Sequence, residues 1–459
     1  MTRPQSGLLV LFVLIAYPMW VVGGTQPAWQ FPLPVLAALL LGITALDVRR
    51  NLLRDPVALG GALLLLLLLL QWANSNRPQI FDSLLQAWTV GPPAVPFLPS
   101  SVVRADAAEM LRWFFPVWAI ALAARHLVAR RDADRRLLMR AVLIAASVLA
   151  AGSIIQFAIA TQWEIGVIPS HSYFVTSFGY ANHAGSFFVL CLCLALGETL
   201  STMLHRHPVR HRVTALICGL LCFGGVLVSL SRSAILLSLA CIVVSILYLL
   251  LYRDAGGSAA RFNRVMAALA ILITAFLLLY PLFGTSVTDE LSKRSPKTSD
   301  LNLSANWTYS AVDNIRPLYR QVAVGIFKDY PWFGAGGWSV RHLGILYLPA
   351  QSHRLLQTPG AANTHNDLLQ FLSEFGLVGV ALLWISIGIM AAPLIRYPLH
   401  TWRSPRVFFS LLGLLVILIH SAVDLPFRCP AVLFLWTLTL ALAGCTSSRT
   451  DPVVERPLR

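Results

Sequence analysis

Residues 213–252 read VTALICGLLCFGGVLVSLSRSAILLSLACIVVSILYLLLY, forty residues that carry a single charge, Arg232. A helix needs about 20 apolar residues to cross the hydrocarbon core of a membrane. The stretch is therefore long enough for two spans, with Arg232 at or near the turn between them. It predicts a tight helical hairpin inserted in a membrane.

The composition of the whole chain agrees with this interpretation. Of the 459 residues, 57 % are hydrophobic and only 12 % are charged, whereas soluble domains carry about 25 % charged residues. The formal net charge is +15, but most basic residues are arginines in short runs between apolar stretches, where they orient a protein in a membrane. We therefore expect an all-α polytopic membrane protein and no nucleic-acid partner.

Twelve apolar stretches are long enough to be transmembrane helices. They cover residues 7–23, 31–47, 57–74, 109–128, 137–160, 181–200, 213–230, 233–252, 265–283, 366–393, 407–423 and 431–445. An even number of spans puts both termini on one side. The chain then divides into nine helices with short loops (residues 1–283), a long connection with helices of its own (284–365), and three helices with a short tail (366–459).

The arginines and lysines orient these spans. Short connections on the side of the termini hold most of them, whereas the short connections on the other side hold only Arg77, Arg104, Arg232 and Arg428. Positive residues stay in the cytoplasm. The sequence therefore predicts cytoplasmic termini and a long loop that faces outward.

Neither a metal site nor a disulfide framework is predicted. Of the seven cysteines, all but Cys429 lie in or beside apolar runs, without metal-ligand spacing. The stretch RDADRR offers Asp132 and Asp134 in a D-x-D pattern that many sugar-nucleotide transferases use for a metal. Both aspartates fall in a predicted cytoplasmic loop among arginines, and we interpret them as part of a solvated charge run. No cofactor is expected.

Arg232 admits two interpretations from its surroundings in the sequence. An arginine at a membrane edge can extend its guanidinium to lipid headgroups. Arg232 also lies between serines in SLSRSA without an acidic neighbour in the sequence, and the planar guanidinium matches the geometry of a phosphate. Both interpretations stay open at this point.

The long outward loop contains an amphipathic stretch, WTYSAVDNIRPLYRQVAVGIFKDYP, at residues 307–331. Its apolar residues recur every three or four positions, which predicts a helix that carries Arg316 and Arg320. The next residues, WFGAGGWSV, are rich in glycine and aromatic side chains. They predict a turn that either brings its backbone close to a ligand or packs on the membrane surface.

Polar residues also mark the outward ends of two predicted spans. The stretch THNDLLQFLSEFGLVG, residues 364–379, opens the tenth span with His365 and Asn366 and carries Glu374 further inside it. A lone carboxylate at that depth is costly and needs a partner. The sixth span opens with Asn182 and His183 on the same predicted side of the membrane.

Three motifs, in order along residues 170–395, resemble the O-antigen ligase and polymerase family of bacterial envelope glycosyltransferases. The family pattern H-N-x-x-L-x-x-x-x-E-x-G-x-x-G is met by His365, Asn366, Leu369, Glu374, Gly376 and Gly379. An arginine fifteen residues before a Pro-aromatic-hydrophobic-Gly turn is met by Arg316 and the PWFG at 331–334. The S-R hairpin is met at 231–234, and a looser Gly-x-x-N-x-x-Gly mouth at Gly179, Asn182 and Gly185.

The resemblance implies an activity. Members move a glycan from an undecaprenyl diphosphate carrier to an acceptor on the periplasmic face, and the ligases use lipid A–core as acceptor, invert the anomeric centre and need no metal. Many members have a second histidine before the motif histidine, where this chain has Thr364. The resemblance therefore does not extend to a mechanism that needs two adjacent histidines.

Roles for the candidate residues follow from this chemistry. A diphosphate leaving group needs positive charge, which Arg232 and Arg316 can supply, and a sugar hydroxyl needs a base, for which His365 is the candidate. His365 could equally donate a hydrogen bond to the diphosphate. Glu374 is expected to pair with Arg232 or to orient residues of the neighbouring hairpin. Supporting positions are Asn182, Arg320, Asn366 and Glu374.

Other functions fit the sequence less well. Within the family, the alternatives to the ligase are an O-antigen polymerase and then a protein O-oligosaccharyltransferase. Outside it, a transporter of lipid-linked oligosaccharides would also have about twelve spans, but transporters place ionisable groups near the membrane midplane between repeated halves. In this chain the polar residues concentrate instead on one side.

Overall fold

The computed structural model describes residues 3–52, 54–75, 79–82, 87–159, 176–205, 208–251, 316–347 and 363–447. Nearly all of them are helical. The α-helices are α1 (Arg3–Trp20), α2 (Pro32–Leu52), α3 (Pro56–Ala73), α4 (Arg104–Ala123), α5 (Asp132–Ile159), α6 (Ala181–Leu204), α7 (Val209–Val228), α8 (Arg232–Leu251), α11 (Arg316–Asp329), α12 (Ser339–Tyr347), α13 (Asp367–Arg396), α14 (Pro398–Arg403), α15 (Pro405–Ser421) and α16 (Pro430–Ser447).

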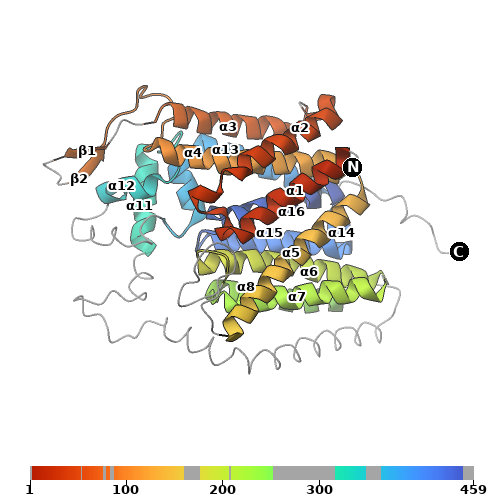
Figure 1. Ribbon diagram of the computed structural model, residues 1–459. Helices are drawn as coiled ribbons and strands as arrows, with labels where there is room; N and C mark the ends of the chain where they lie inside the picture. The colour runs from red at the N-terminus through yellow and green to blue at the C-terminus, as the bar shows by residue number, and fades with distance from the viewer. Residues whose placement is uncertain are drawn as a thin grey trace, which may run out of the picture.

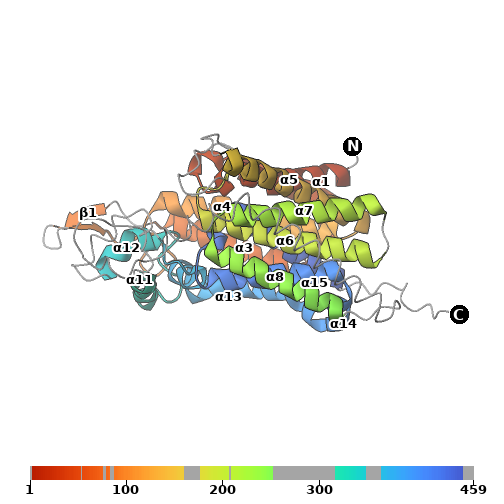
Figure 2. The same ribbon diagram turned by 90° about the horizontal axis from the view of Figure 1, so that it is seen from below.

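The long helices lie side by side and run between two ends of the molecule (Figure 1 and Figure 2). The helices α11 and α12 lie beyond the bundle at one end, which we call the α11 end. The start of α1 and the short helix α14 lie at the opposite end. The bundle therefore lies between two ends of the molecule.

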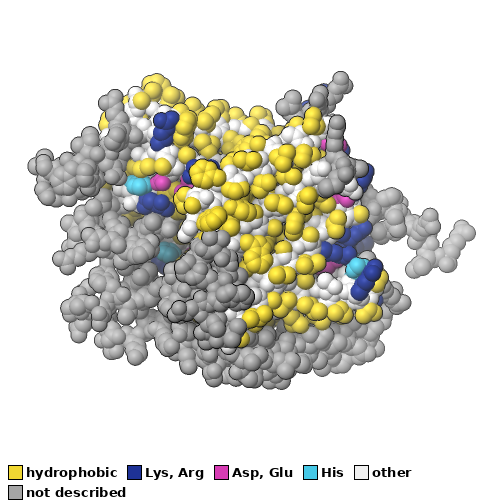
Figure 3. All heavy atoms as spheres, viewed as in Figure 1, with side chains coloured by type: hydrophobic (Ala, Val, Ile, Leu, Met, Phe, Trp, Pro, Cys, Tyr) yellow, Lys and Arg dark blue, Asp and Glu magenta, His cyan; other side chains and the backbone are white. Residues whose placement is uncertain are grey.

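Hydrophobic side chains cover the middle of the described surface, and charged side chains gather towards the two ends (Figure 3). Among the described helices, eight are long and apolar enough to cross a membrane, and the three ranges Gln5–Trp20, Pro405–Ser421 and Pro430–Cys445 are shorter apolar helices. An apolar belt around a helical bundle is the expected surface of a protein in lipid, where every backbone group must be satisfied within the helix. The protein is a polytopic membrane protein, as the sequence predicts.

The predicted spans agree closely with the described helices, with one exception that lies outside the described residues. The predicted span at 265–283 and the part of the amphipathic stretch at 307–315 fall there. The rest of that stretch forms α11. The count of twelve spans remains a prediction.

The all-α prediction is confirmed, with one small addition among the described residues. A β-hairpin pairs β1 (Gln79–Asp82) with β2 (Ala87–Val90) in antiparallel register, with Gln79 opposite Val90. It lies at the α11 end, away from the helical bundle (Figure 1).

The helix α6 lies at the centre of the bundle. It packs against α5, α7, α8, α15 and α16, and 83 % of its apolar stretch is buried, against 17 % for α13. Small residues permit this packing: a Cβ at Gly185 would come within 2.5 Å of the Ala234 Cβ of α8. The first turn of α6 is thus held directly against the hairpin turn that precedes α8.

The helix α13 is broken at Gly376, whose φ of 62° and ψ of −170° are not helical. Residues 331–337, which contain the PWFG turn, fill the break. Four backbone hydrogen bonds join the two segments, from Leu377 N to Pro331 O (2.8 Å), Val378 N to Trp332 O (3.0 Å), Ala335 N to Ser373 O (2.9 Å) and Gly336 N to Glu374 O (2.9 Å). The turn therefore replaces the helical hydrogen bonds that the break removes.

Two glycines make this close approach possible. A Cβ at Gly376 would come within 2.5 Å of the Trp332 carbonyl carbon, and a Cβ at Gly334 would overlap the backbone of Glu374. Both glycines also have positive φ, which L side chains rarely adopt. The glycines of the two motifs are needed for the same contact, which we call the α13 interlock (residues 331–337 and 373–378).

Candidate active site

His365 lies in the turn directly before α13. Its φ of 50° is unusual for a residue with a side chain, and the neighbouring side chains stabilise the turn. Thr364 donates a hydrogen bond to Asn366 O at 2.8 Å and accepts one from Asn366 N at 3.2 Å. Asn366 in turn caps α13 by accepting a hydrogen bond from Leu369 N at 3.0 Å. Thr364 thus shapes the turn that presents His365.

The turn packs against residues 422–425, which follow α15. Asn366 Nδ2 donates to Ala422 O at 2.8 Å, and His365 Nδ1 lies 3.8 Å from Asp424 Oδ1. On the other side, Arg316 Nη1 donates to Val423 O at 3.3 Å and Arg316 Nη2 lies 3.8 Å from Asp424 Oδ2. Asp424 therefore lies between the candidate base and one of the candidate diphosphate ligands.

The first turn of α6 binds the same carboxylate. Tyr180 Oη donates to Asp424 at 3.1 Å, and Asn182 Nδ2 donates both to Asp424 and, at 2.8 Å, to Tyr180 Oη. Ser231 Oγ donates to Asn182 Oδ1 at 2.6 Å. The Asn182 amide thus links Asp424 to the turn before α8, and its hydrogen-bonding groups are satisfied.

The electrostatics around Asp424 keep it ionised. Burial alone would raise the pKa of its carboxyl, but His365, His420 and Arg316 hold the pKa well below its usual range. The side chain is almost fully buried. A buried carboxylate with this many donors is a fixed negative charge, suited to orienting cationic or protonatable side chains.

The His365 imidazole is buried but its two ring nitrogens make no hydrogen bond to any described residue. The ring stacks at 6.5 Å on Tyr319 of α11, which fixes its plane. A buried polar group without a partner is costly and calls for an explanation. Nδ1 lies 3.8 Å from Asp424 Oδ1, which is longer than a hydrogen bond, and Nε2 has no partner among the described residues.

Glu374 lies within the α13 interlock and is paired with Arg428, not with Arg232 as we expected. Arg428 Nη2 donates to Glu374 Oε2 at 2.6 Å, and Gln370 Nε2 donates to Glu374 Oε1 at 3.0 Å. Arg428 Nε also lies 3.8 Å from Asp367 Oδ1. The sequence alone does not identify Arg428 as the partner of Glu374. Arg428 lies in the connection η6 (Pro426–Arg428), which is brought to α13 only by the fold.

Aromatic rings complete this buried cluster. The Arg428 guanidinium lies 4.9 Å from the Trp338 ring centre and 4.8 Å from that of Phe371, so its faces are covered by cation–π contacts. Gln71 of α3 donates to the carbonyls of Phe333 (2.8 Å) and Glu374 (3.1 Å). Glu374 is therefore a residue that positions the segments around the site.

The structure places the remaining candidates at the same end of the bundle. Arg232 is exposed as the first residue of α8, directly after Ser231, which is bonded to Asn182. Arg320 lies one turn after Arg316 on α11, and its Nε makes no hydrogen bond to a described residue. His365, Arg316, Asn182 and Asn366 are thus brought together around residues 422–425. Arg232 directly follows Ser231, the hydrogen-bond partner of Asn182.

Asp424, Tyr180 and Arg428 take part in these contacts although the sequence did not single them out as site residues. Asp424 and Arg428 both lie in HSAVDLPFRCP, the short connection before α16. The sequence does offer one indication of their role. An acidic and a basic residue lie together between two apolar stretches, on the predicted outward side. Among the described residues, no group of three His, Cys, Asp or Glu side chains could hold a metal ion.

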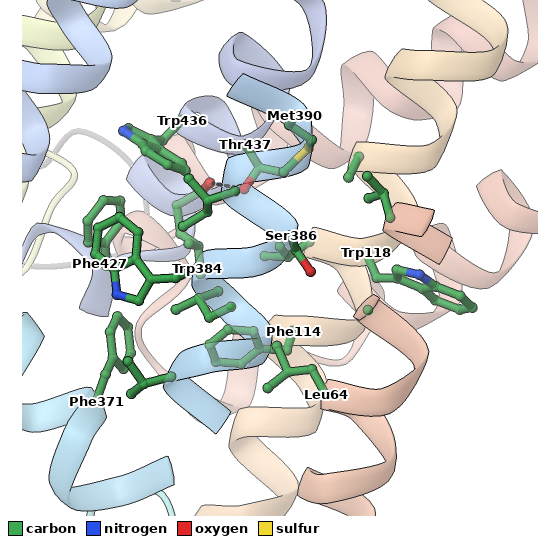
Figure 4. A pocket seen from close by; sticks show the side chains of 18 of the residues that line it. Leu64, Phe114, Trp118, Phe371, Trp384, Ser386, Met390, Phe427, Trp436 and Thr437 are labelled. Atoms are coloured by element: carbon green, nitrogen blue, oxygen red, sulfur yellow. Dashed lines mark hydrogen bonds between the residues drawn. The ribbon is translucent and has the colours of Figure 1, made fainter. Parts of the chain in front are cut away.

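An apolar cavity of about 250 Å³ lies between α3, α4, α13 and α16 (Figure 4). Phe371 and Phe427 line it near the charged cluster, and Trp118, Trp384 and Met390 line it further along the bundle. Leu368, one turn after His365, belongs to the same lining. The cavity could accommodate a hydrocarbon chain whose polar end lies near His365.

The comparison with known families agrees with these observations. A family model described as O-antigen ligase matches residues 217–384, which include Arg232, Arg316, His365 and the α13 interlock. No curated protein matches the chain. Asp424, Asn182 and Arg428 lie outside the matched residues and are connected to them only through the fold. Residues 217–384 are thus similar to the O-antigen ligase family of membrane glycosyltransferases, which act on lipid-linked glycans.

Proposed function

We propose that the protein is an O-antigen ligase. It transfers the O-antigen glycan from undecaprenyl diphosphate to lipid A–core, on the periplasmic face of the bacterial inner membrane. The observation that carries the proposal is the position of His365. Its unbonded imidazole lies between Tyr319 and the fixed negative charge of Asp424, with Arg316 on the other side of that carboxylate.

In this proposal His365 activates the acceptor. The acceptor hydroxyl loses its proton to the imidazole nitrogen that faces the substrate, while its oxygen forms the new bond to the anomeric carbon from the side opposite the phosphate. Asp424 stabilises the imidazolium that results. The bond between the anomeric carbon and the phosphate oxygen breaks, so the configuration inverts and undecaprenyl diphosphate leaves.

The leaving group is a diphosphate, which needs no proton but gains negative charge as the bond breaks. Arg316 is oriented towards the site by Val423 O and Asp424, and Arg232 begins α8 beside the Ser231–Asn182 hydrogen bond. We assign both arginines to the diphosphate, because a guanidinium binds phosphate oxygens in a planar, bidentate way. Two arginines can stabilise this charge without a metal ion.

The apolar cavity between α3, α4, α13 and α16 supports the assignment of a lipid substrate. Its lining begins at Leu368 and Phe371, within two turns of His365. We assign the part of the polyprenyl chain nearest the diphosphate to this cavity. The reactive end of the carrier would then lie at the α11 end while its hydrocarbon remains inside the bundle.

The test is the lipopolysaccharide of a deletion strain complemented with the gene or its variants. A ligase null should have core without any O-antigen, with polymer accumulating on the lipid carrier, and the wild-type gene should restore the ladder. His365→Ala should fail to restore it although the protein is inserted at normal levels, whereas His342→Ala, a histidine of α12 paired with Asp106, should restore it.

Three results would contradict the proposal. A null strain whose core carries a single repeat unit would identify the protein as a polymerase, because ligation would then be intact. Full activity of His365→Ala would remove the imidazole from the mechanism. Accumulation of the carrier on the inner leaflet would instead indicate a transporter.

A further inference from the structure

A second cavity, with arginines in its lining, lies at the end of the bundle opposite α11. It has a volume of about 100 Å³ and is lined by α5, α6, α15 and α16. α6 and α13 begin at the α11 end, and α15 begins only after α13 has crossed the bundle. The start of α15 and the second half of α6 therefore lie far from His365. The proposed transfer reaction uses none of these residues.

Positive charge surrounds this cavity. Its lining contains Arg135, Arg136 and Arg406, and a single carboxylate, Glu198. Glu198 is already bonded by two arginines, Arg406 at 2.5 Å and Arg140 at 2.8 Å. Asp132, which does not line the cavity, pairs with Arg135 at 3.2 Å, but the Asp132 side chain is much more exposed than that of Arg135. The lining therefore retains a surplus of positive charge.

The first turn of α15 adds to the positive electrostatic potential in the cavity. Ser404 is the N-cap of α15 and lines the cavity, yet its side chain makes no capping hydrogen bond. Pro405 follows at the first helical position. The N-terminus of a 17-residue helix carries partial positive charge and backbone N–H groups that favour an anion. The helix start and the arginines thus favour the same kind of ligand.

Part of the lining of the cavity is apolar. Met139, Val407, Leu442 and Ala443 contribute to it beside the arginines. A small hydrated anion gains nothing from such a lining, whereas an amphiphile gains from both parts of the cavity. Arginines that only orient a protein in the membrane need no cavity and no shared, partly buried carboxylate. Glu198 fixes the side chains of Arg140 and Arg406, which reduces the entropy lost on binding.

We propose that this cavity binds the phosphodiester headgroup of an anionic membrane phospholipid. Arg135, Arg136 and Arg406 bind the phosphate oxygens together with the first turn of α15, and the start of one acyl chain covers Met139 and Leu442. The site is separate from the catalytic cluster and does not depend on the proposed function. Its occupant belongs to the membrane leaflet on the arginine-rich side of the protein.

The experiment uses the purified full-length protein in a non-ionic detergent. Phosphatidylglycerol, phosphatidylcholine with the same acyl chains, and inorganic phosphate are added separately, and the apparent melting temperature is measured against concentration. Phosphatidylglycerol should raise the melting temperature in a saturable way. Phosphatidylcholine and inorganic phosphate should not.

Two matched double variants locate the effect. Arg135→Gln/Arg136→Gln removes two charges from the cavity and should weaken the response to phosphatidylglycerol by about tenfold or more. Arg130→Gln/Arg210→Gln removes two charges from the same end of the bundle, from residues that do not line the cavity, and should respond like the wild type. The single variant Arg136→Gln, which breaks no ion pair among the described residues, should show a severalfold weaker response.

Three results would overturn the proposal. The first is an equal response to phosphatidylcholine, which would indicate a general effect of lipid. The second is an equal response to inorganic phosphate, which would show that the cavity takes the ion alone. The third is a wild-type response of both Arg135→Gln/Arg136→Gln and Arg136→Gln, which would place the effect elsewhere.

Discussion

Asp424 interacts with four residues of the candidate site, His365, Arg316, Tyr180 and Asn182. These residues come from the turn before α13, from α11 and from the start of α6. A single buried carboxylate thus aligns elements that are far apart in the sequence. The motif residues His365, Arg316 and Asn182 are therefore positioned by Asp424, which belongs to none of the motifs.

Replacement of Asp424 should change stability in a way that depends on pH. Because the folded pKa of Asp424 is lowered, its stabilising contribution is present above the unfolded pKa of about 3.9 and is lost as pH falls through the folded value. The difference in apparent melting temperature between wild type and Asp424→Asn should be constant from about pH 5 to pH 8. It should shrink as the pH falls below about 4.

Thermal unfolding in detergent across this pH range measures the difference. Asp47→Asn, at a partly exposed carboxylate paired with Arg130 at the opposite end, is the control and should have a small effect throughout. A destabilisation by Asp424→Asn that grows as the solution becomes more acidic would contradict the assigned charge state.

Arg316 should not tolerate replacement by lysine. Its guanidinium is held by two groups, Val423 O and Asp424, and an ammonium cannot maintain both contacts and a bidentate phosphate contact. Both Arg316→Ala and Arg316→Lys should lower transfer by about 100-fold or more, measured as glycan transferred to lipid A–core by purified protein. Lys328→Ala, at an exposed position of the same helix, should retain activity, and an active Arg316→Lys would remove the bidentate contact from the mechanism.

At the level of elements, the α13 interlock explains why two sequence motifs occur together. The PWFG turn and the E-x-G-x-x-G segment each lack part of their backbone hydrogen bonding, and each supplies what the other lacks. Glu374, within the α13 interlock, pairs with Arg428, and the Arg428 guanidinium makes cation–π contacts with Trp338 and Phe371. The break in α13 also directs its first two turns, and hence His365, towards α11.

Adding one methyl group should disrupt the interlock. Gly376→Ala places a Cβ within 2.5 Å of the Trp332 backbone at a positive φ, so the turn and the helix cannot stay in contact. We expect a loss of about 3 kcal/mol or more, seen as lower amounts of folded protein and no transfer. Gly388→Ala, in the same helix with nothing within 4 Å, is the matched control and should behave like the wild type. Normal folding of Gly376→Ala would mean that the interlock is dispensable.

At the scale of the whole molecule, the orientation in the membrane is still a prediction from the distribution of arginines. Of the cysteines, six are buried and Cys445 is half-buried, so background reaction with a thiol reagent should be low. Lys328→Cys on α11 should react with a membrane-impermeant maleimide added to intact spheroplasts. Arg210→Cys, at the start of α7, should react only after the membrane is opened. The reverse pattern would invert the predicted topology.

Much of the architecture could be predicted because apolar length alone determines a span. The ranges 181–200, 213–230 and 233–252 anticipate α6, α7 and α8 within a few residues. The pairing of charges could not be predicted in this way. Several arginines on the same predicted side could have been the ion-pair partner of Glu374. Only the fold of residues 426–428 brings Arg428 to it. Asp424 was missed because it lies outside every motif and gains its contacts from tertiary structure.

The α13 interlock has a consequence for exchanging parts between related enzymes. Residues 331–337 and residues 373–378 fit each other through backbone atoms and two glycines, while α11 also carries Arg316 to the site. A loop transplanted from a relative without its partner helix would meet a foreign backbone at the junction. The smallest segment that can be exchanged in a chimera therefore includes Arg316 to Gly379 together with the residues at 422–428 that contact it. Recombination breakpoints between Arg316 and Gly379 should fail.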